Sequence, residues 1–240
     1  MEIKGRRVLI TGANRGLGRA LTLACLSAGA SEVLAGVRQP DNLQETFHDE
    51  RVKAVSLDIT SETDVKAAAE MGRVDILINN AGICLFGSVL RVPIEQLQHE
   101  IEVNYFGALR MARAFAPAMI EHGDGLIVNV ASILGKVSVP AMGNYCAMKA
   151  ALLSLSQALR GDLAGSGVRV ITVLPGTIDT DMSRNFGGPK MTAEQAALEI
   201  IEAIRNEKTE TVIGDGARGI AAGLASDPQA IETSFALYRA

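Results

Sequence analysis

The sequence predicts an α/β fold, with one doubly wound domain in which a parallel sheet lies between two layers of helices. Two observations support this prediction. Short apolar runs alternate with amphipathic segments along the whole chain, as they do in βαβ units. The apolar runs lack polar/apolar alternation, which is typical of strands buried on both faces. No linker, low-complexity tract or internal repeat interrupts this pattern, so residues 1–240 are expected to form a single domain.

The elements follow in order along the chain. Apolar runs predict strands at 7–10, 32–37, 52–57, 75–78, 126–130, 168–174 and 211–213. Apolar residues at helical spacing predict helices at 19–28, 61–71, 94–121, 144–164 and 193–206. Ser61 and Asn144 are the expected helix caps. The crossovers 39–53 and 60–74 are short, which predicts reduced outer helices.

Composition excludes several classes of protein. The chain has 23 basic and 27 acidic residues and a net charge of −4. Mild acidity without basic runs argues against nucleic acid and anionic membranes as partners. Cys25, Cys84 and Cys146 are scattered, so they are predicted to be small packing residues, and no metal site is expected. No stretch approaches the ~20 apolar residues of a membrane span. The protein is therefore predicted to be cytoplasmic.

A glycine-rich turn lies directly between the first strand and its helix, with glycines at 12, 16 and 18. Glycines allow a tight turn and a close backbone approach, and a helix N-terminus attracts phosphate. The spacing differs from the G-x-G-x-x-G fingerprint. The turn predicts a nucleotide phosphate site, and a plain tight turn is the alternative.

The end of the second strand indicates which nucleotide is bound. In NAD-selective folds an acidic side chain there binds the ribose 2′-hydroxyl, but this chain has Val37 followed by Arg38, and Arg15 lies in the glycine loop. Planar guanidinium groups bind phosphate well. The pair predicts recognition of a 2′-phosphate and hence NADP(H), and the alternative is two ordinary solvated arginines.

Several further motifs occur in a characteristic order, and together they resemble the short-chain dehydrogenase/reductase family over nearly the whole chain. The motifs are Thr11-Gly12-Ala-Asn-Arg-Gly16-Leu-Gly18, Asn79-Asn80-Ala81-Gly82, Asn104, Ser132, Tyr145-Cys-Ala-Met-Lys149 and Pro175-Gly176-Thr-Ile-Asp-Thr180. The resemblance implies a Rossmann-type sheet of seven parallel strands in the order 3-2-1-4-5-6-7. It also implies a nicotinamide cofactor across the carboxyl ends of the strands.

By position, the resemblance assigns roles to individual residues. Asp58 would bind the adenine amino group, and Asn80 would line the adenosine ribose. Ile178 and Thr180 would meet the nicotinamide carboxamide. The full set of expected cofactor residues is Gly12, Asn14, Arg15, Gly16, Leu17, Gly18, Arg38, Asp58, Ile59, Asn80, Ala81, Gly82, Tyr145, Lys149, Pro175, Gly176, Ile178 and Thr180.

The expected catalytic residues are Asn104, Ser132, Tyr145 and Lys149. Tyr145 and Lys149 are four residues apart and share one helix face. A free tyrosine has a pKa of about 10, and a nearby ammonium group is expected to lower it. Tyr145 would exchange a proton with the substrate oxygen, Lys149 would also hold the nicotinamide ribose, and Ser132 would bind the oxygen. Asn104 would hold a relay water. Each residue also has a structural alternative. Tyr145 and Lys149 could be a pair on the helix surface, Ser132 could form a turn or cap a helix, and Asn104 could be a hydrogen-bonded amide in the core.

The substrate region is apolar. The long connection 177–191 contains glycines and polar residues and is predicted to be a lid. The expected pocket walls are Leu85, Phe86, Leu134, Val137, Val139 and Met142. They favour small neutral aldehydes, ketones or secondary alcohols. One alternative is 3-oxoacyl reduction on an acyl carrier protein, for which Arg110 and Arg113 are the only candidate basic patch, and another is a non-catalytic dinucleotide sensor.

The two long helices predict a homo-oligomer. Apolar residues occupy more than one face of each helix, which indicates a partner surface. A tetramer is expected, with a dimer as the smaller possibility. Residues 226–240, with Phe235, Leu237 and Tyr238, are expected to cover a second interface or a neighbour's pocket. The apolar helix residues are Leu97, Ile101, Phe106, Leu109, Met111, Phe115, Met119, Leu152, Leu153, Leu155, Ala158, Leu159 and Leu163.

Overall fold

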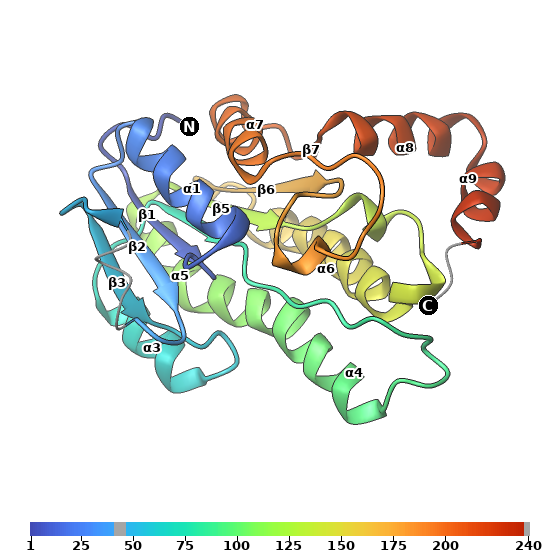
Figure 1. Ribbon diagram of the computed structural model, residues 1–240. Helices are drawn as coiled ribbons and strands as arrows, with labels where there is room; N and C mark the ends of the chain where they lie inside the picture. Colours follow the sequence, from blue (N-terminus) through green and yellow to red (C-terminus); the bar gives the residue numbers. More distant parts are fainter. Residues whose placement is uncertain (41–46, 238–240) are drawn as a thin grey trace.

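A parallel sheet forms the centre of the molecule. The computed structural model describes residues 1–40 and 47–237 (Figure 1). Within these residues the sheet has seven strands in the order β3-β2-β1-β4-β5-β6-β7, which confirms the prediction. The strands are β1 (Arg7–Thr11), β2 (Glu32–Val37), β3 (Val52–Ser56), β4 (Ile76–Asn79), β5 (Gly125–Val130), β6 (Val168–Pro175) and β7 (Glu210–Ile213).

Helices cover both faces of the sheet (Figure 1). Alternate residues of each strand point to opposite faces, so in β1 Val8 and Ile10 enter one core and Leu9 enters the other. The first core lies under α1 (Gly16–Ser27) and α7 (Ala193–Asn206), which pack against each other. On the other face lie α3 (Glu62–Glu70), α4 (Ile94–Ile101), α5 (Ala108–His122) and α6 (Gly143–Asp162).

Several expected boundaries were wrong. α1 begins at Gly16 rather than at residue 19, so the last residues of the glycine-rich turn form the first turn of the helix. The single helix expected at 94–121 contains a π-helical turn, η1 (Glu102–Gly107), between α4 and α5. Asn144 does not cap α6, because the helix begins at Gly143 and has no side-chain cap.

Other features of the helices agree with the sequence or were missed. Ser61 caps α3 as expected, by accepting the Asp64 N–H, and α3 is short. The crossover 39–53 lies partly outside the described residues. The structure adds two C-terminal helices, α8 (Asp215–Ser226) and α9 (Pro228–Phe235), that the sequence analysis missed.

The carboxyl ends of the strands meet at one edge of the sheet. β1 ends at Thr11, β4 at Asn79, β5 at Val130 and β6 at Pro175. In open parallel sheets, ligands bind at this edge. No helix in the described part of the chain is long and apolar enough to cross a membrane.

Candidate active site

A cavity of about 1780 Å³ opens at the carboxyl edge of the sheet. It is lined by every residue expected to bind the cofactor, and by Ser132. Of the expected site residues, Asn104 alone lies outside this lining in the described part of the chain. Residues that follow the ends of strands β1 to β6 are thus brought together. In the part of the chain that the structure describes, no group of three or more His, Cys, Asp or Glu residues could hold a metal ion.

The glycine loop is built so tightly that side chains would not fit. A Cβ atom on Gly18 would lie 2.1 Å from the Gly12 carbonyl oxygen, and Gly12 itself has a φ of +68°. Thr11 Oγ1 accepts the backbone N–H groups of Asn80 (3.0 Å) and Ala81 (2.9 Å). The first turn of α1 contains no acidic residue and no side-chain cap, so its N–H groups suit a phosphate ligand.

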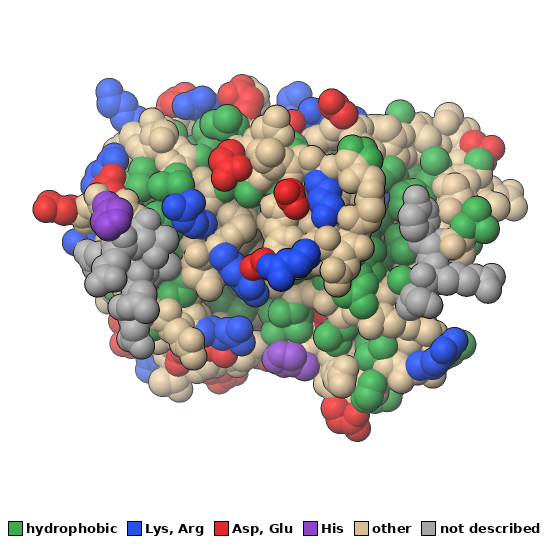
Figure 2. Space-filling model, viewed as in Figure 1, with side chains coloured by type: hydrophobic (Ala, Val, Ile, Leu, Met, Phe, Trp, Pro, Cys, Tyr) green, Lys and Arg blue, Asp and Glu red, His purple; other side chains and the backbone are tan. Residues whose placement is uncertain are grey.

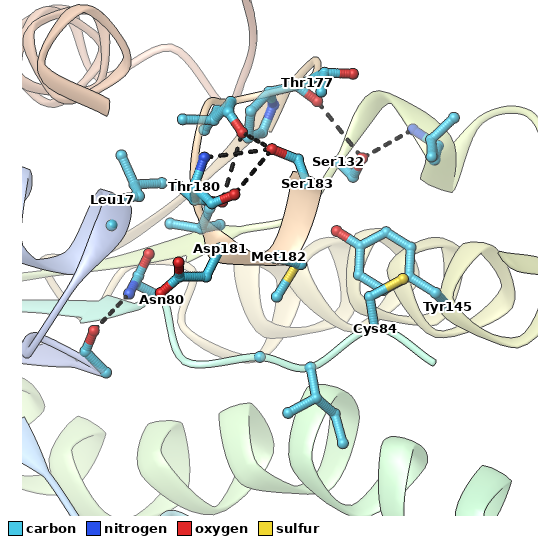
Figure 3. Close-up of a pocket in the computed structure, with 18 of the residues that line it drawn as sticks. Leu17, Asn80, Cys84, Ser132, Tyr145, Thr177, Thr180, Asp181, Met182 and Ser183 are labelled. Atoms are coloured by element: carbon cyan, nitrogen blue, oxygen red, sulfur yellow. Dashed lines mark hydrogen bonds between the residues drawn. The ribbon is translucent and has the colours of Figure 1, made fainter. Parts of the chain in front are cut away.

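Asn80 has a structural partner that the sequence did not predict. Its Nδ2 donates to the Thr11 carbonyl oxygen at 2.9 Å (Figure 3), so its amide ties β4 to the end of β1. Asp58 accepts the backbone N–H (2.9 Å) and the hydroxyl (2.7 Å) of Thr60. Burial favours its neutral form, but these bonds and the Arg38 charge outweigh burial and lower the pKa of Asp58. An ionised acceptor therefore faces the cavity at the place expected for adenine.

The two arginines expected to bind a 2′-phosphate differ in their surroundings. Arg38 is exposed at the end of β2 and lines the cavity. Arg15 donates to Asp181 at 2.8 Å, and Asp181 also pairs with Arg184. In Figure 2, basic and acidic side chains lie together near the centre of the face. Arg15 therefore links the glycine loop to residues 177–191.

One part of the cavity lining holds three of the predicted catalytic residues, Tyr145, Lys149 and Ser132. Tyr145 is in the first turn of α6, and the Lys149 Nζ lies 5.5 Å from its ring centroid. Lys149 is buried and donates to the Val130 carbonyl oxygen at 2.8 Å. Ser132 Oγ accepts the Leu134 N–H at 3.1 Å and donates to the Pro175 carbonyl oxygen at 3.5 Å. The phenol oxygen of Tyr145 points towards Ser132 (Figure 3).

The electrostatics of this group differ from the expectation. Burial raises the pKa of Tyr145, and the hydrogen bond with Ser132 opposes that rise only in part. Burial also lowers the pKa of Lys149 to about 8, while the nearby Cys84 and Glu100 oppose the change. Without a bound cofactor, the protein therefore keeps the Tyr145 phenol protonated at neutral pH. This differs from the prediction that Lys149 lowers the pKa of Tyr145. A protonated phenol at neutral pH is a proton donor.

Asn104 lies in the π-helical turn and is buried. Its Nδ2 donates to the Ile83 carbonyl oxygen (2.8 Å), and its Oδ1 accepts the Ile83 N–H (3.2 Å). A Cβ atom on Gly82 would lie 2.7 Å from that Oδ1. The side chain thus clamps the segment after β4, and its amide is engaged by protein groups. π-Helical turns occur frequently at functional sites.

The apolar walls correspond only in part to the prediction. Phe86, Leu134, Val139 and Met142 line the cavity, but Leu85 and Val137 do not. Cys25 and Cys146 are buried, as predicted, and Cys84 is half-buried. Cys84 packs against the cluster of Val139, Met142 and Cys146 and also lines the cavity, which the sequence did not indicate.

Two further aromatic residues line the cavity. Phe186 packs edge-on against Phe86 at 5.0 Å between ring centroids. Phe235 of α9 lines the cavity of its own chain, where an interface or a neighbour's pocket was expected. Tyr238, expected beside it, lies outside the described residues.

Residues 177–191 form a closed loop over the cavity. The Asp179 N–H donates to the Met191 carbonyl oxygen (2.8 Å), and the Met191 N–H donates to the Thr177 carbonyl oxygen (3.0 Å). The short helix η4 (Asp181–Ser183) lies between these ends, and its Met182 points into the cavity (Figure 3). These two hydrogen bonds hold the ends of the loop together.

Comparison with known protein families shows which family the chain belongs to. The sequence model described as "short chain dehydrogenase" matches residues 6–190. The chain belongs to this family. It is 34% identical over 222 residues to a 3-oxoacyl-(acyl-carrier-protein) reductase of Thermotoga maritima, covering 88% of this chain and 89% of that protein. It is 33% identical over 232 residues to a ketoacyl reductase of Nostoc, covering 88% and 79%.

Solved structures support the same relationship. A short chain dehydrogenase from Burkholderia cenocepacia in complex with NADP has a TM-score of 0.93 and 43% identity, covering 98% of this chain and 99% of that one. A 3-ketoacyl-(acyl-carrier-protein) reductase from Brucella melitensis complexed with NADH has a TM-score of 0.81 and 27% identity, covering 88% and 96%. The predicted family, fold, oxidoreductase activity and NADP(H) cofactor are therefore confirmed.

Proposed function

We propose that this short-chain dehydrogenase reduces the carbonyl group of small, mostly apolar aldehydes and ketones with NADPH. The observation that carries the proposal is the position of Tyr145 and Ser132, whose oxygens face each other at one end of a cavity walled by Phe86, Leu134 and Met142. An apolar substrate fits these walls and would present its single polar atom to the two hydroxyl groups.

The residues fit the cofactor. The cradle around Gly12 and Gly18 leaves no room for a Cβ atom, and the N-terminus of α1 carries no competing acid. Arg38 would contact the 2′-phosphate, Asp58 the adenine and Lys149 the nicotinamide ribose. When bound, NADPH supplies the hydride that reduces the carbonyl carbon. The Burkholderia cenocepacia structure holds NADP, which supports this choice of nucleotide.

The chain's own residues handle the proton. Ser132 and Tyr145 hold the carbonyl oxygen and polarise the carbonyl group. Tyr145 donates its proton to that oxygen as the carbon is reduced. The Lys149 ammonium stabilises the phenolate that results. In the reverse direction the phenolate removes the proton of an alcohol. We propose that residues 177–191 close over the bound molecules as a lid and exclude water.

A second candidate is 3-oxoacyl reduction on an acyl carrier protein. The relatives from Thermotoga maritima and Brucella melitensis, named for this activity, favour it. An acidic carrier needs a basic surface beside the pocket. Arg110 is already paired with Glu102 at 2.5 Å and donates to the Ile59 carbonyl oxygen at 2.9 Å. Arg113 is exposed, but neither arginine lines the cavity. The small-molecule substrate therefore remains the first proposal.

A substrate panel tests the two candidates. We expect the enzyme to oxidise NADPH with apolar aldehydes and ketones. The kcat/KM for these substrates is expected to equal or exceed that for 3-oxoacyl thioesters attached to the acyl carrier protein. A kcat/KM about 100-fold higher for the carrier-bound substrate supports the second candidate. NADPH binding without turnover of any substrate supports a dinucleotide sensor and contradicts both.

A further inference from the structure

Glu100 is a buried acidic residue that the proposed mechanism does not use. It lies near the end of α4 and has an exposed fraction of 0%. Its Oε1 accepts the Leu85 N–H at 2.8 Å, and its Oε2 accepts Nδ2 of Asn144 at 2.5 Å. These partners are neutral, and within the described residues Glu100 forms no salt bridge.

Burial of such a group does not favour stability by itself. Removing an ionised carboxylate from water is unfavourable, and hydrogen bonds to neutral donors offset that penalty only in part. An apolar side chain would fill the same space without this cost. The carboxyl group at Glu100 is therefore better explained by the segments that it connects.

The segments that Glu100 connects form two sides of the reaction site. Asn144 immediately precedes Tyr145 in the first turn of α6, a turn that has no side-chain cap. Leu85 belongs to the segment after β4, in which Asn104 holds Ile83 by two hydrogen bonds.

Cys84 lies between the two clamped residues of that segment. Its side chain faces the cavity beside Tyr145 (Figure 3). One carboxyl group thus spans the gap between the helix that carries the phenol and the wall opposite it.

We propose that Glu100, acting through Asn144 and Leu85, is a positioning residue that fixes Tyr145 relative to the Cys84 wall of the cavity. The proposal rests on the proposed role of Tyr145 as proton donor. Displacement of a reacting group by about 1 Å reduces rates by about 100-fold. The glycine loop and Arg38 lie outside this contact, so the loss falls on kcat and leaves NADPH affinity nearly unchanged.

A charge swap tests the contact. Asn144→Asp places a carboxylate against Glu100 and breaks the hydrogen bond. The double variant E100Q/N144D restores a donor opposite an acceptor, because the glutamine amide donates to the new aspartate. Glu95→Gln is the control, since Glu95 is exposed on the same helix. For each variant, kcat, the NADPH dissociation constant and the melting temperature are measured.

We expect N144D to lower kcat by about 10-fold or more, with the NADPH dissociation constant within about threefold of wild type. The double variant is expected to recover kcat to within about threefold, and the control to match wild type. A folded N144D with wild-type kcat overturns the proposal. It is also overturned if the double variant recovers the melting temperature but not kcat, because the contact is then only structural.

Two arrangements keep the test decisive. If N144D does not fold, the double variant is compared directly with wild type, and a kcat below about a tenth of wild type overturns the proposal. Tyr145→Phe is assayed in parallel. Retained activity in Tyr145→Phe contradicts the proposed function, whereas an inactive Tyr145→Phe beside a fully active N144D contradicts the positioning role alone.

Discussion

At the scale of single residues, Lys149 has the surroundings that matter most for chemistry. Its ammonium group is buried and donates to the Val130 carbonyl oxygen rather than to a carboxylate. Burial disfavours the charged form and lowers the pKa of Lys149 to about 8. Lys149 thus titrates close to neutral pH.

This titration predicts a pH dependence. In the proposed mechanism the ammonium form of Lys149 holds the nicotinamide ribose and stabilises the phenolate, and this form predominates below the pKa. We therefore expect kcat/KM for NADPH to be constant well below pH 8, to reach half of its maximum near pH 8 and to fall further at higher pH. Steady-state rates between pH 6 and 10 measure this profile. A flat profile to pH 9.5 contradicts the assignment.

Arg38 is predicted to select the nucleotide. A charge-assisted hydrogen bond contributes about 1.5–3 kcal/mol. Arg38→Asp is therefore expected to lower kcat/KM for NADPH by about 10- to 100-fold and to narrow or reverse the preference over NADH. The control is Arg113→Asp, which changes the same charge at an exposed position outside the cavity. Equal kcat/KM values for the two nucleotides in the wild-type protein contradict this role.

At the scale of elements, the junction of β1 and α1 is the most constrained. Gly18 lies in the first turn of α1, with its α-carbon packed over the Gly12 carbonyl group. Thr11 and Asn80 take part in five hydrogen bonds that join this junction to β4 and the residues after it. The proposed pyrophosphate site therefore depends on backbone geometry, whereas the proposed 2′-phosphate contact depends on Arg38.

Two glycine-to-alanine substitutions, one in the junction and one control, test this dependence on backbone geometry. Gly18→Ala places a Cβ atom 2.1 Å from the Gly12 oxygen, so we expect a loss of about 1–3 kcal/mol in the free energy of unfolding and weaker NADPH binding. Gly161→Ala, in α6, meets no atom within 4 Å. We expect that control to gain roughly 0.5–1 kcal/mol. Urea unfolding and NADPH titration measure both changes, and unaltered values for Gly18→Ala contradict the account.

The sequence predicts elements well where the signal is local. Uninterrupted apolar runs identify the strands, and the motifs at their carboxyl ends identify the residues that meet in the cavity. α8 was missed because Gly216, Gly219 and Gly223 weaken a helical pattern that packing against the rest of the chain stabilises. The sequence did not show that Cys84 also faces the cavity, because the segment after β4 is irregular and no period of the sequence fixes the direction of its side chains.

At the scale of the whole molecule, the chain buries most of the apolar residues expected at an interface. Met111, Phe115, Leu152 and Leu155 are buried in the cores of one chain. Phe106 and Ile120 remain 43% and 44% exposed. The available apolar surface on these helices is thus smaller than the sequence indicated.

A homo-oligomer remains our prediction. Phe106 lies in η1 and Ile120 in α5, and a two-fold contact over these two elements would cover both side chains. Light scattering at micromolar concentration is expected to give a tetramer of the 25.3 kDa chain. A dimer mass contradicts only the second interface, and a monomer mass contradicts the oligomer itself.

The central claim is that Tyr145 protonates a carbonyl oxygen in an NADPH-dependent reduction. A single-turnover experiment with NADPH and an apolar aldehyde, comparing wild type with Tyr145→Phe, tests it directly. Proton transfer by a positioned side chain contributes about 10²–10⁴-fold, so we predict that the variant binds NADPH with an affinity within a few-fold of wild type and loses at least about 100-fold in the rate of NADPH oxidation. A variant that keeps a tenth or more of the wild-type rate, with chemistry rate-limiting, contradicts the claim.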